Sequence, residues 1–236
     1  MLEIVSFTLG PAQTNAYLVA DSETREAVVI DPSWDGHIIL DAAKKRGWRI
    51  GHMWYTHAHF DHIGGAGAIA DALNPLPLVA LHPNDHVLWR AGGGGAIFGF
   101  DIDPGPEPTI DFEHGQILRL GDVEFEVRFT PGHTLGHCIL YVATPDPRAE
   151  RSDPTLAPHA SVGVGEQSRS VCFCGDLIFA GSVGRTDLPG GDWEQLVESI
   201  KTQVFTMPDD TRLLSGHGPE TTVGKEKVSN PFVGGM

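Results

Sequence analysis

Cysteine is scarce in this chain of 236 residues, which contains three: Cys138, Cys172 and Cys174. Three thiols cannot form a disulfide framework, so the fold must be stabilised by a buried apolar core. Because Cys172 and Cys174 stand at alternate positions of an apolar run, we expect both to be buried as small hydrophobic residues. The alternative is that Cys174, which directly precedes Gly175-Asp176, lies beside a functional site.

Basic residues are also few, since 16 Lys and Arg stand against 31 Asp and Glu and give a formal net charge of −15 at pH 7. This excess of negative charge disfavours binding to nucleic acid and to anionic membranes, and we expect neither as a partner. Apolar runs of membrane-spanning length are absent, as is an N-terminal basic-then-apolar signal. We therefore expect a cytoplasmic protein.

The composition is otherwise that of a globular protein, with 41% hydrophobic and 20% charged residues. The length is ample for a buried core, and we expect a single domain over residues 1–236. The 29 glycines and 17 prolines indicate many loops, which are where functional sites usually lie. A polar, proline-bearing stretch at 145–169 interrupts the pattern of strands, and we interpret it as an inserted loop.

Local patterns predict a mixture of strands and helices. Runs rich in β-branched residues predict strands at 2–9, 15–20, 26–30, 50–55, 123–130, 138–143 and 171–174. Apolar residues at helical spacing predict helices at 36–46, 62–73, 83–89 and 193–204. The glycine run at 92–95 is interpreted as a flexible linker without side chains to pack. The stretch 96–108 is expected to be either a lid over a pocket or a surface loop that buries Phe98 and Phe100.

The densest chemical signal is the segment 56–62, with the sequence Thr-His-Ala-His-Phe-Asp-His. Side chains two apart lie on the same side of an extended segment, so His57, His59 and Asp61 are expected to converge, with His62 following from the adjacent turn. Such nitrogen and oxygen donors suit divalent zinc, iron or manganese, and four of them can serve more than one ion. A histidine-rich surface loop that binds nothing is the alternative, and the density of the motif disfavours it.

Three later segments share one arrangement, in which an apolar strand-like run is followed by a glycine and then by a side chain able to bind metal. They end in Gly132-His133, Gly175-Asp176 and Gly216-His217. Glycine lets the backbone approach other groups closely, and we expect these strand ends to converge on one edge of the fold.

The other histidines lack this arrangement and are expected not to be ligands: His37, His52, His82, His86, His114, His137 and His159. Among them His137 has an alternative role, because it follows His133 by four residues and is able to orient a ligand. A plain packing role is the expectation.

The motifs at 57–62, 131–134, 175–176 and 216–217, in this order, resemble the metallo-β-lactamase fold superfamily of binuclear metallohydrolases. The resemblance spans nearly the whole chain. The segments 184–191 and 216–222 are most similar to the glyoxalase II type, the hydroxyacylglutathione hydrolases. The resemblance implies an α/β fold: an αββα sandwich with metals at one edge, between two mixed sheets.

The resemblance also implies roles for named residues. One ion would be held by His57, His59 and His133, a second by Asp61, His62 and His217, and Asp176 would bridge the two. The implied catalytic residues are Asp61, His62 and Asp176. The implied cofactors are two divalent ions, zinc first, with iron or manganese as alternatives. A water between two such ions loses its proton readily and attacks a carbonyl carbon.

The implied reaction is hydrolysis of a thioester, in particular S-D-lactoylglutathione, to glutathione and a hydroxy acid. A thiol departs as thiolate without being protonated, so a thioester suits a site that has no separate acid. Arg185 matches a basic residue that contacts glutathione in glyoxalase II enzymes, and its guanidinium can bind a carboxylate bidentately. The alternative is that Arg185 only ties loops together.

The sequence departs from the glyoxalase II pattern where those enzymes contact glutathione. Two of their tyrosines correspond here to Asp187 and to Gly218-Pro219, and a separate C-terminal helical domain is not expected after Phe232. Acyl and thiol specificity and the oligomeric state therefore stay open. The alternative functions are a persulfide dioxygenase with one iron held by His57, His133 and Asp176, and a lactonase or β-lactamase of the same fold.

Overall fold

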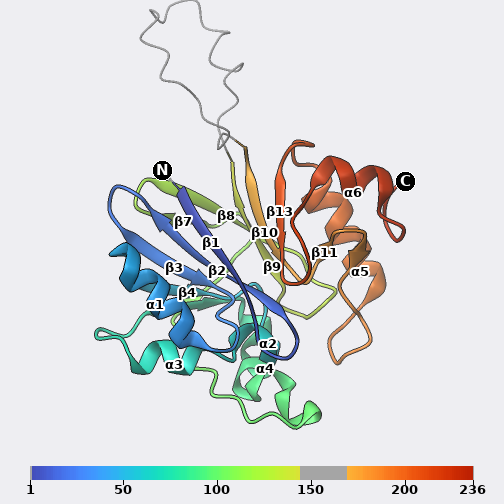
Figure 1. Cartoon of the computed structure of the whole chain (residues 1–236). Coiled ribbons are helices and arrows are strands. Elements are labelled where there is room, and N and C mark those ends of the chain that lie inside the picture. The colour runs from blue at the N-terminus through green and yellow to red at the C-terminus, as the bar shows by residue number, and fades with distance from the viewer. Residues whose placement is uncertain (1, 144–168, 236) are drawn as a thin grey trace, which may run out of the picture.

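The computed structural model describes residues 2–143 and 169–235. Within these residues two six-stranded sheets pack face to face, and helices cover the outer face of each sheet (Figure 1). The α/β class and the αββα sandwich predicted from the sequence are confirmed. The inserted loop predicted at 145–169 lies outside the described residues, apart from Arg169.

The first sheet combines an antiparallel half with a parallel half. In spatial order its strands are β1 (Leu2–Leu9), β2 (Thr14–Asp21), β3 (Glu26–Ile30), β4 (Arg49–Trp54), β5 (Leu78–Leu81) and β6 (Ile110–Asp111). Strands β1 to β3 pair antiparallel, whereas β3 to β6 pair parallel. Parallel neighbours need crossover connections, and these contain α1 (Gly36–Arg46), α2 (Phe60–Ile63) and α3 (Ala66–Asp71).

The turns after β5 are short and helical. They are η1 (Pro83–Asp85), α4 (His86–Arg90) and η2 (Gly92–Phe98), and the sequence predicts the first two as one helix at 83–89. Helix α4 packs Trp89 into the cluster on the outer face of the first sheet.

The second sheet is mostly antiparallel. In spatial order its strands are β14 (Thr221–Thr222), β13 (Arg212–Ser215), β10 (Val171–Gly175), β9 (Cys138–Val142), β8 (Val123–Phe129) and β7 (Ile117–Leu120). Among these pairs β10 and β13 run parallel. A hairpin of β11 (Ile178–Phe179) and β12 (Ser182–Val183) follows β10, and the covering helices are α5 (Trp193–Ser199), its π-helical continuation η4 (Ile200–Val204) and α6 (Val223–Ser229).

The core lies in three apolar layers, one between the sheets and one under each set of helices. Strand β10 is buried on both faces, with Val171 and Phe173 between the sheets and Cys172 and Cys174 under α5. Fully burying a side chain such as Phe173 contributes about 1.5–3 kcal/mol. All three cysteines are free and buried, so the prediction that they act as small hydrophobic residues is confirmed.

The single helix predicted at 62–73 is wrong. The chain forms α2 and α3 instead, and the break falls at Gly64-Gly65. A methyl group on Gly65 would lie 1.8 Å from the carbonyl oxygen of Ser33, and the Gly65 N–H donates to the carbonyl of Pro32 at 2.9 Å. Because the backbone of Pro32 and Ser33 packs against Gly65, a single helix cannot continue through this turn.

The glycine run at 92–95, interpreted from the sequence as a flexible linker, is packed against the histidine motif. Gly93 and Gly95 are buried, and a methyl group on Gly93 would lie 2.2 Å from the backbone nitrogen of Phe60. Beyond the run, Phe98 and Phe100 pack on the Phe60 ring with centroid separations of 5.2 and 5.4 Å. Phe100 is half-buried, in line with the surface-loop alternative for 96–108, but Phe98 is 46% exposed, so the burial expected for Phe98 is wrong.

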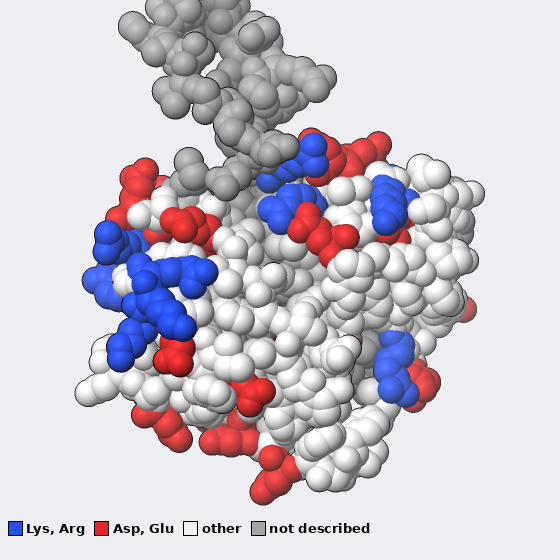
Figure 2. All heavy atoms as spheres, in the orientation of Figure 1, with Lys and Arg blue, Asp and Glu red and all other residues white. Residues whose placement is uncertain are grey.

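Charged side chains are unevenly spread over the face shown in Figure 2. Lys and Arg gather beside α1, whose last turn carries Lys44, Lys45 and Arg46, while the middle of this face is mostly uncharged. Over 2–143 and 169–235, none of the helices combines the length and the hydropathy that crossing a bilayer requires.

The packing of the glycine run can be tested with two matched substitutions. Gly93→Ala should lower the free energy of unfolding by about 1–3 kcal/mol more than Gly99→Ala, because only the first methyl group meets backbone atoms. Both glycines have positive φ, 64° for Gly93 and 82° for Gly99, and nothing lies within 4 Å of a Cβ at Gly99. Urea unfolding measures the difference, and equal losses would contradict the packing.

Candidate metal centre

The ends of four strands meet at one end of the sandwich and bring together the side chains that the sequence singles out. The segment 56–62 follows β4 and enters α2, His133 lies in the turn between β8 and β9, Asp176 follows β10, and His217 follows β13. All are buried except His217, which is half-buried. The first sheet therefore supplies one part of the cluster and the second sheet supplies the other.

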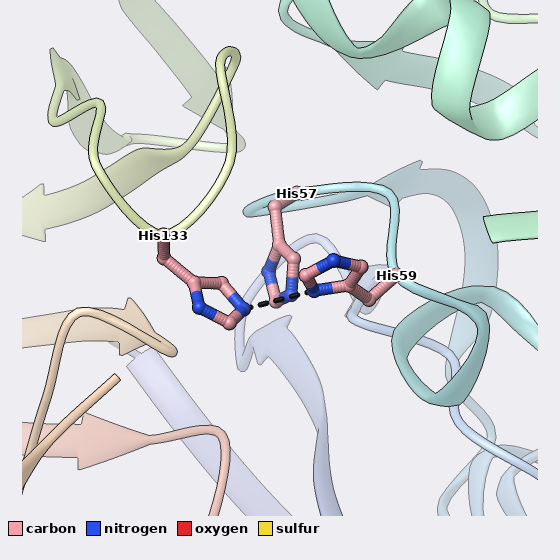
Figure 3. Close-up of side chains that lie close together, drawn as sticks. All are labelled: His57, His59 and His133. Atoms are coloured by element: carbon pink, nitrogen blue, oxygen red, sulfur yellow. Dashed lines mark hydrogen bonds between the residues drawn. The ribbon is translucent and has the colours of Figure 1, made fainter. Parts of the chain in front are cut away.

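His57, His59 and His133 form the first group. Their ligand nitrogens all lie within 4.8 Å of one another. In Figure 3 the three rings point toward one another, two from the segment after β4 and one from the turn between β8 and β9. His59 Nδ1 and His133 Nε2 are 2.9 Å apart.

Asp61, His62 and His217 form the second group, again with ligand atoms within 4.8 Å. His217 Nε2 lies 3.3 Å from Asp61 Oδ2, and His62 Nε2 lies 3.6 Å from the same oxygen. The alternation argument, which put Asp61 beside His57 and His59, is wrong because the chain turns into α2 at Phe60. Helix α2 instead places Asp61 and His62 beside His217.

Asp176 lies between the two groups. Its Oδ1 is 3.3 Å from His62 Nε2, while its Oδ2 is 3.6 Å from His133 Nε2 and 3.4 Å from His217 Nε2. One carboxylate thus faces both groups, which a single imidazole nitrogen cannot do. Asp31, His57 and His62 also lie within 4.8 Å, but the Asp31 carboxylate is occupied by hydrogen bonds described below.

Several buried atoms of this cluster have no hydrogen-bond partner among the described residues, including His57 Nε2, His62 Nε2 and Asp176 Oδ1. Leaving a buried polar atom unsatisfied costs about 1–3 kcal/mol, so such atoms concentrated in one place need an explanation. Imidazole and carboxylate donors at these separations suit divalent ions. The residues present therefore fit the metal centre that the motif predicts.

The protonation of the first group also suits a cation. Burial lowers the pKa of His57 well below its usual value, lowers that of His59 to about 3 and lowers that of His133. The three imidazoles are consequently neutral at pH 7 and have lone pairs free to bind an ion.

In the second group, positively charged histidines pair with negatively charged carboxylates. Burial opposes ionisation, but the carboxylates of Asp176 and Asp61 raise the pKa of His62 well above its usual value and raise that of His217 to about 9. In return His62 and His217 hold the pKa of Asp61 at about 2 and that of Asp176 well below its usual value. Protons on these two histidines would leave when a cation binds.

Asp31 fixes the ring orientation of two histidines, and the sequence patterns assigned it no role. Its carboxylate accepts the Thr56 N–H at 2.7 Å, the Thr56 hydroxyl at 2.7 Å and His62 Nδ1–H at 3.0 Å. Since the Thr56 hydroxyl proton goes to Asp31, Thr56 Oγ1 must accept from His57 Nδ1–H, 3.0 Å away. Asp31 thus makes Nε2 of both His57 and His62 face the cluster, with a free lone pair on His57 and, once its second proton has left, on His62.

His133 and Asp61 are held in the same way by other groups. His133 Nδ1–H donates to the backbone carbonyl of Arg185 at 2.7 Å, which leaves its Nε2 with the lone pair. Asp61 Oδ2 accepts the hydroxyl of Thr14 at 2.7 Å. Arg185 lies in the loop after β12 and Thr14 at the start of β2, so both side chains are held by residues outside the cluster.

Gly216 keeps room in the cluster. A methyl group there would lie 2.2 Å from Asp176 Oδ1 and 2.6 Å from His62 Cε1. The arrangement of glycine followed by a ligand type, noted in the sequence, therefore has a steric reason at this position.

The remaining predicted residues lie outside both groups. The Arg185 guanidinium is exposed and makes a bidentate ion pair with Asp187, at 2.7 and 2.9 Å. His137 is buried with its ring 5.2 Å from that of His57, and its Nδ1 lies 2.9 Å from the Thr130 hydroxyl. Within the described residues, none of the histidines expected to be non-ligands joins a group, and His159 lies outside that part of the chain.

Known proteins related to this chain share one family. Residues 9–146 and 152–217 match the model of the Metallo-beta-lactamase superfamily. The chain is 34% identical to "Probable metallo-hydrolase YqgX" of Bacillus subtilis, with 97% of this chain and 96% of the relative covered. It is 31% identical to "Hydroxyacylglutathione hydrolase GloC" of Haemophilus influenzae, with 98% and 97% covered.

Solved structures resemble it over most of their length. BLEG-1, a B3 metallo-beta-lactamase, has a TM-score of 0.80 at 32% identity, with 100% of both chains covered. TTHA1623 in a di-iron-bound form has a TM-score of 0.75 at 35% identity, with 97% of this chain and 99% of that chain covered. ETHE1 from Myxococcus xanthus has a TM-score of 0.75 at 25% identity, with 99% and 85% covered.

The contribution of Asp31 can be measured by metal binding. Asp31→Asn should weaken divalent-ion affinity about 10–100-fold, because an amide cannot accept all three hydrogen bonds that the carboxylate accepts. Asp21→Asn is the matched control, since Asp21 is also buried but accepts the N–H groups of Glu23 and Thr24 at the end of β2. Competition with a chromophoric chelator gives both affinities. An equal loss in the two variants would mean that Asp31 acts through general stability.

Proposed function

The chain belongs to the metallo-beta-lactamase superfamily and is a metallo-hydrolase, and we propose that it hydrolyses thioesters at a centre of two divalent ions. The substrate class to test first is S-acylglutathione, with S-D-lactoylglutathione as its representative. The products would be glutathione and a hydroxy acid.

The observation that carries the proposal is the position of Asp176. Its Oδ1 lies 3.3 Å from His62 Nε2 of the second group, and its Oδ2 lies between the groups, 3.6 Å from His133 Nε2 and 3.4 Å from His217 Nε2. A single mononuclear site would not need a carboxylate shared with a second complete set of donors. The geometry therefore favours two ions over the one iron of a persulfide dioxygenase.

Each group would hold one ion, the first through His57, His59 and His133 and the second through Asp61, His62 and His217, with Asp176 shared between them. When bound, two divalent ions supply a water of lowered pKa and a Lewis acid for the substrate carbonyl. The ions would be zinc, with iron or manganese as alternatives. The di-iron-bound form of TTHA1623 supports a centre of two ions on this fold.

The protein's own groups would manage the proton of the attacking water. Asp61 is ionised, because its pKa is about 2, and its Oδ2 accepts the Thr14 hydroxyl, which fixes where the carboxylate points. Because a carboxylate with a pKa of about 2 holds a proton only weakly, Asp61 would pass the proton on after attack and would not store it. The leaving thiolate needs no proton, so an additional acid is not required for a thioester.

Substrate would approach from the side of His217. The His217 side chain is 30% exposed, compared with 12% for Asp176 and 0% for His62. The Phe179 ring lies 5.8 Å from the His217 ring and offers an apolar contact beside this opening. An acyl group bound here would have its carbonyl next to the second group.

Recognition of the glutathione part is proposed for Arg185. Its Nε and Nη2 are bound by Asp187, but the guanidinium has five N–H donors, so some stay free for a substrate carboxylate. The relative from Haemophilus influenzae, which is named hydroxyacylglutathione hydrolase GloC, supports this substrate class. Asp187 would compete with the substrate for the same side chain.

The proposal is tested by metal analysis together with two assays. Purified protein should contain close to two ions per chain and hydrolyse S-D-lactoylglutathione, and Asp176→Ala should abolish turnover and lower the content of both ions. His217→Ala should deplete one ion preferentially, because it removes a donor of the second group. One iron per chain, with oxygen consumption on glutathione persulfide and no thioester hydrolysis, would replace the proposal with a dioxygenase.

The role of Arg185 is tested by its substrate dependence. Arg185→Ala should raise KM for S-D-lactoylglutathione about tenfold to a hundredfold with little change in kcat, since a charge-assisted contact contributes about 1.5–3 kcal/mol. Asp187→Ala should have the opposite effect, a lower KM, because it frees the guanidinium. A neutral thioester without glutathione's carboxylates is the control substrate. An unchanged KM for both substrates in both variants would make Arg185 a residue that only ties loops together.

A further inference from the structure

Asp85 is a buried carboxylate that its own helix does not use. It stands directly before α4, at the position where an aspartate ordinarily accepts an N–H of the first helical turn. Its side chain makes no such bond, although it is only 1% exposed. A buried carboxylate needs partners, and these are found elsewhere in the chain.

The partners of Asp85 belong to the two loops that carry the three-histidine group. Its Oδ2 accepts the backbone N–H of Ala58 at 3.0 Å and the hydroxyl of Thr134 at 2.8 Å, while its Oδ1 accepts the N–H of Gly136 at 2.7 Å. Ala58 stands between His57 and His59, and Thr134 directly follows His133. One carboxylate therefore joins both loops within one residue of each predicted ligand.

The spacing Thr134-x-Gly136 fits this carboxylate. A methyl group on Gly136 would lie 2.7 Å from the backbone nitrogen of Asp85 and 2.8 Å from its Oδ1, so only glycine permits the approach. The preceding residue adds a contact, because Asn84 Nδ2 donates to the carbonyl of Leu135 at 3.3 Å. Asn84 and Asp85 together thus contact each residue of 134–136.

The two loops come from different sheets, one after β4 and one between β8 and β9, so pairing within a sheet does not set their separation. A backbone bond from Cys138 N to Thr56 O, at 2.8 Å, ties them on one side of the histidines. Asp85 joins the two loops at a second place, through Ala58, Thr134 and Gly136. Asp85 contacts none of the second group, in which Thr14 supports Asp61 and Asp31 supports His62. Asp31 also supports His57 through Thr56, so Asp85 is the support that acts on the first group alone.

We propose that Asp85 is a positioning residue that sets the separation of His57 and His59 from His133, and so the affinity of the three-histidine group for its ion. The inference rests on the metal centre of the proposed function. It is read out by ion affinity and not by turnover, so a failure of the thioester substrate leaves it standing.

The decisive variant is Asp85→Asn, measured in two backgrounds that each keep one ion. An amide has one accepting oxygen and one donating nitrogen, so in either orientation its NH2 faces a donor, Gly136 N–H or the pair from Ala58 and Thr134. In the His217→Ala background, where the three-histidine group holds the ion, Zn²⁺ affinity should fall about 10–100-fold. In the His133→Ala background, where the second group holds the ion, it should not change.

The matched control is Glu226→Gln. Glu226 is also a fully buried carboxylate with three partners, Thr221 Oγ1 at 2.5 Å, Gly181 N at 2.9 Å and Asn230 Nδ2 at 2.9 Å, all outside the two histidine loops. It should lower stability without changing either Zn²⁺ affinity. A similar loss of affinity in Glu226→Gln, or an equal loss in both backgrounds, would overturn the proposal by making the effect one of general stability.

A milder variant covers the case in which Asp85→Asn does not fold. Thr134→Val keeps the side-chain shape and removes one of the three hydrogen bonds, so Zn²⁺ affinity of the three-histidine group should fall about twofold to tenfold. Unchanged affinity in this variant would count against the proposal.

Discussion

The arrangement depends on one buried negative charge, the carboxylate of Asp176 at the end of β10. A carboxylate buried in this way must be paired, and here it lies 3.3 Å from His62 and 3.4 Å from His217, with His133 at 3.6 Å. These contacts require four strand ends from two sheets to arrive at the same place. They also require Gly216, because any side chain there would occupy the space beside Asp176. The sandwich supplies the rigid frame that makes this convergence possible.

The orientation of the histidine rings is decided by the residues that surround the cluster. The Thr14 hydroxyl holds Asp61 through Oδ2, while Asp31 and the backbone carbonyl of Arg185 hold His62 and His133 by Nδ1, the atom that faces away from the cluster. Such partners fix which nitrogen carries the lone pair, and they restrict the ring without occupying the place of an ion. Asp85 adds a different kind of support, since it joins backbone and hydroxyl groups of the loops and touches no ring. Asp31 supports both groups, His62 directly and His57 through Thr56, whereas Asp85 contacts only the loops of the first group. The first group can therefore be perturbed separately through Asp85.

In the proposed function, substrate would be selected at the exposed edge of the site, where Arg185 and Asp187 lie. Arg185 and Asp187 are both exposed, so their ion pair is screened by solvent and can rearrange when an anionic substrate arrives. The deep part of the site is built from buried, mutually dependent groups and is common to many reactions of the fold. Differences in thiol or acyl preference between relatives are accordingly expected in the loop that carries Arg185 and beside His217, and not in the donors themselves.

The sequence alone determined the α/β class, the strands of five or more residues, helix α1, the burial of the cysteines and the residues that gather at one end of the sandwich. Those features follow from periodicity, capping and glycine placement, which act between near neighbours in the chain. Only the tertiary structure decided that the helix breaks at Gly64-Gly65, that the glycine run packs on Phe60, and that Asp31 and Asp85 support the histidines. The bonds from Asp31 to Thr56 and from Asp85 to Thr134 span 25 and 49 positions. No local pattern reports such contacts, because they join residues that are far apart in the sequence and meet only in the folded chain.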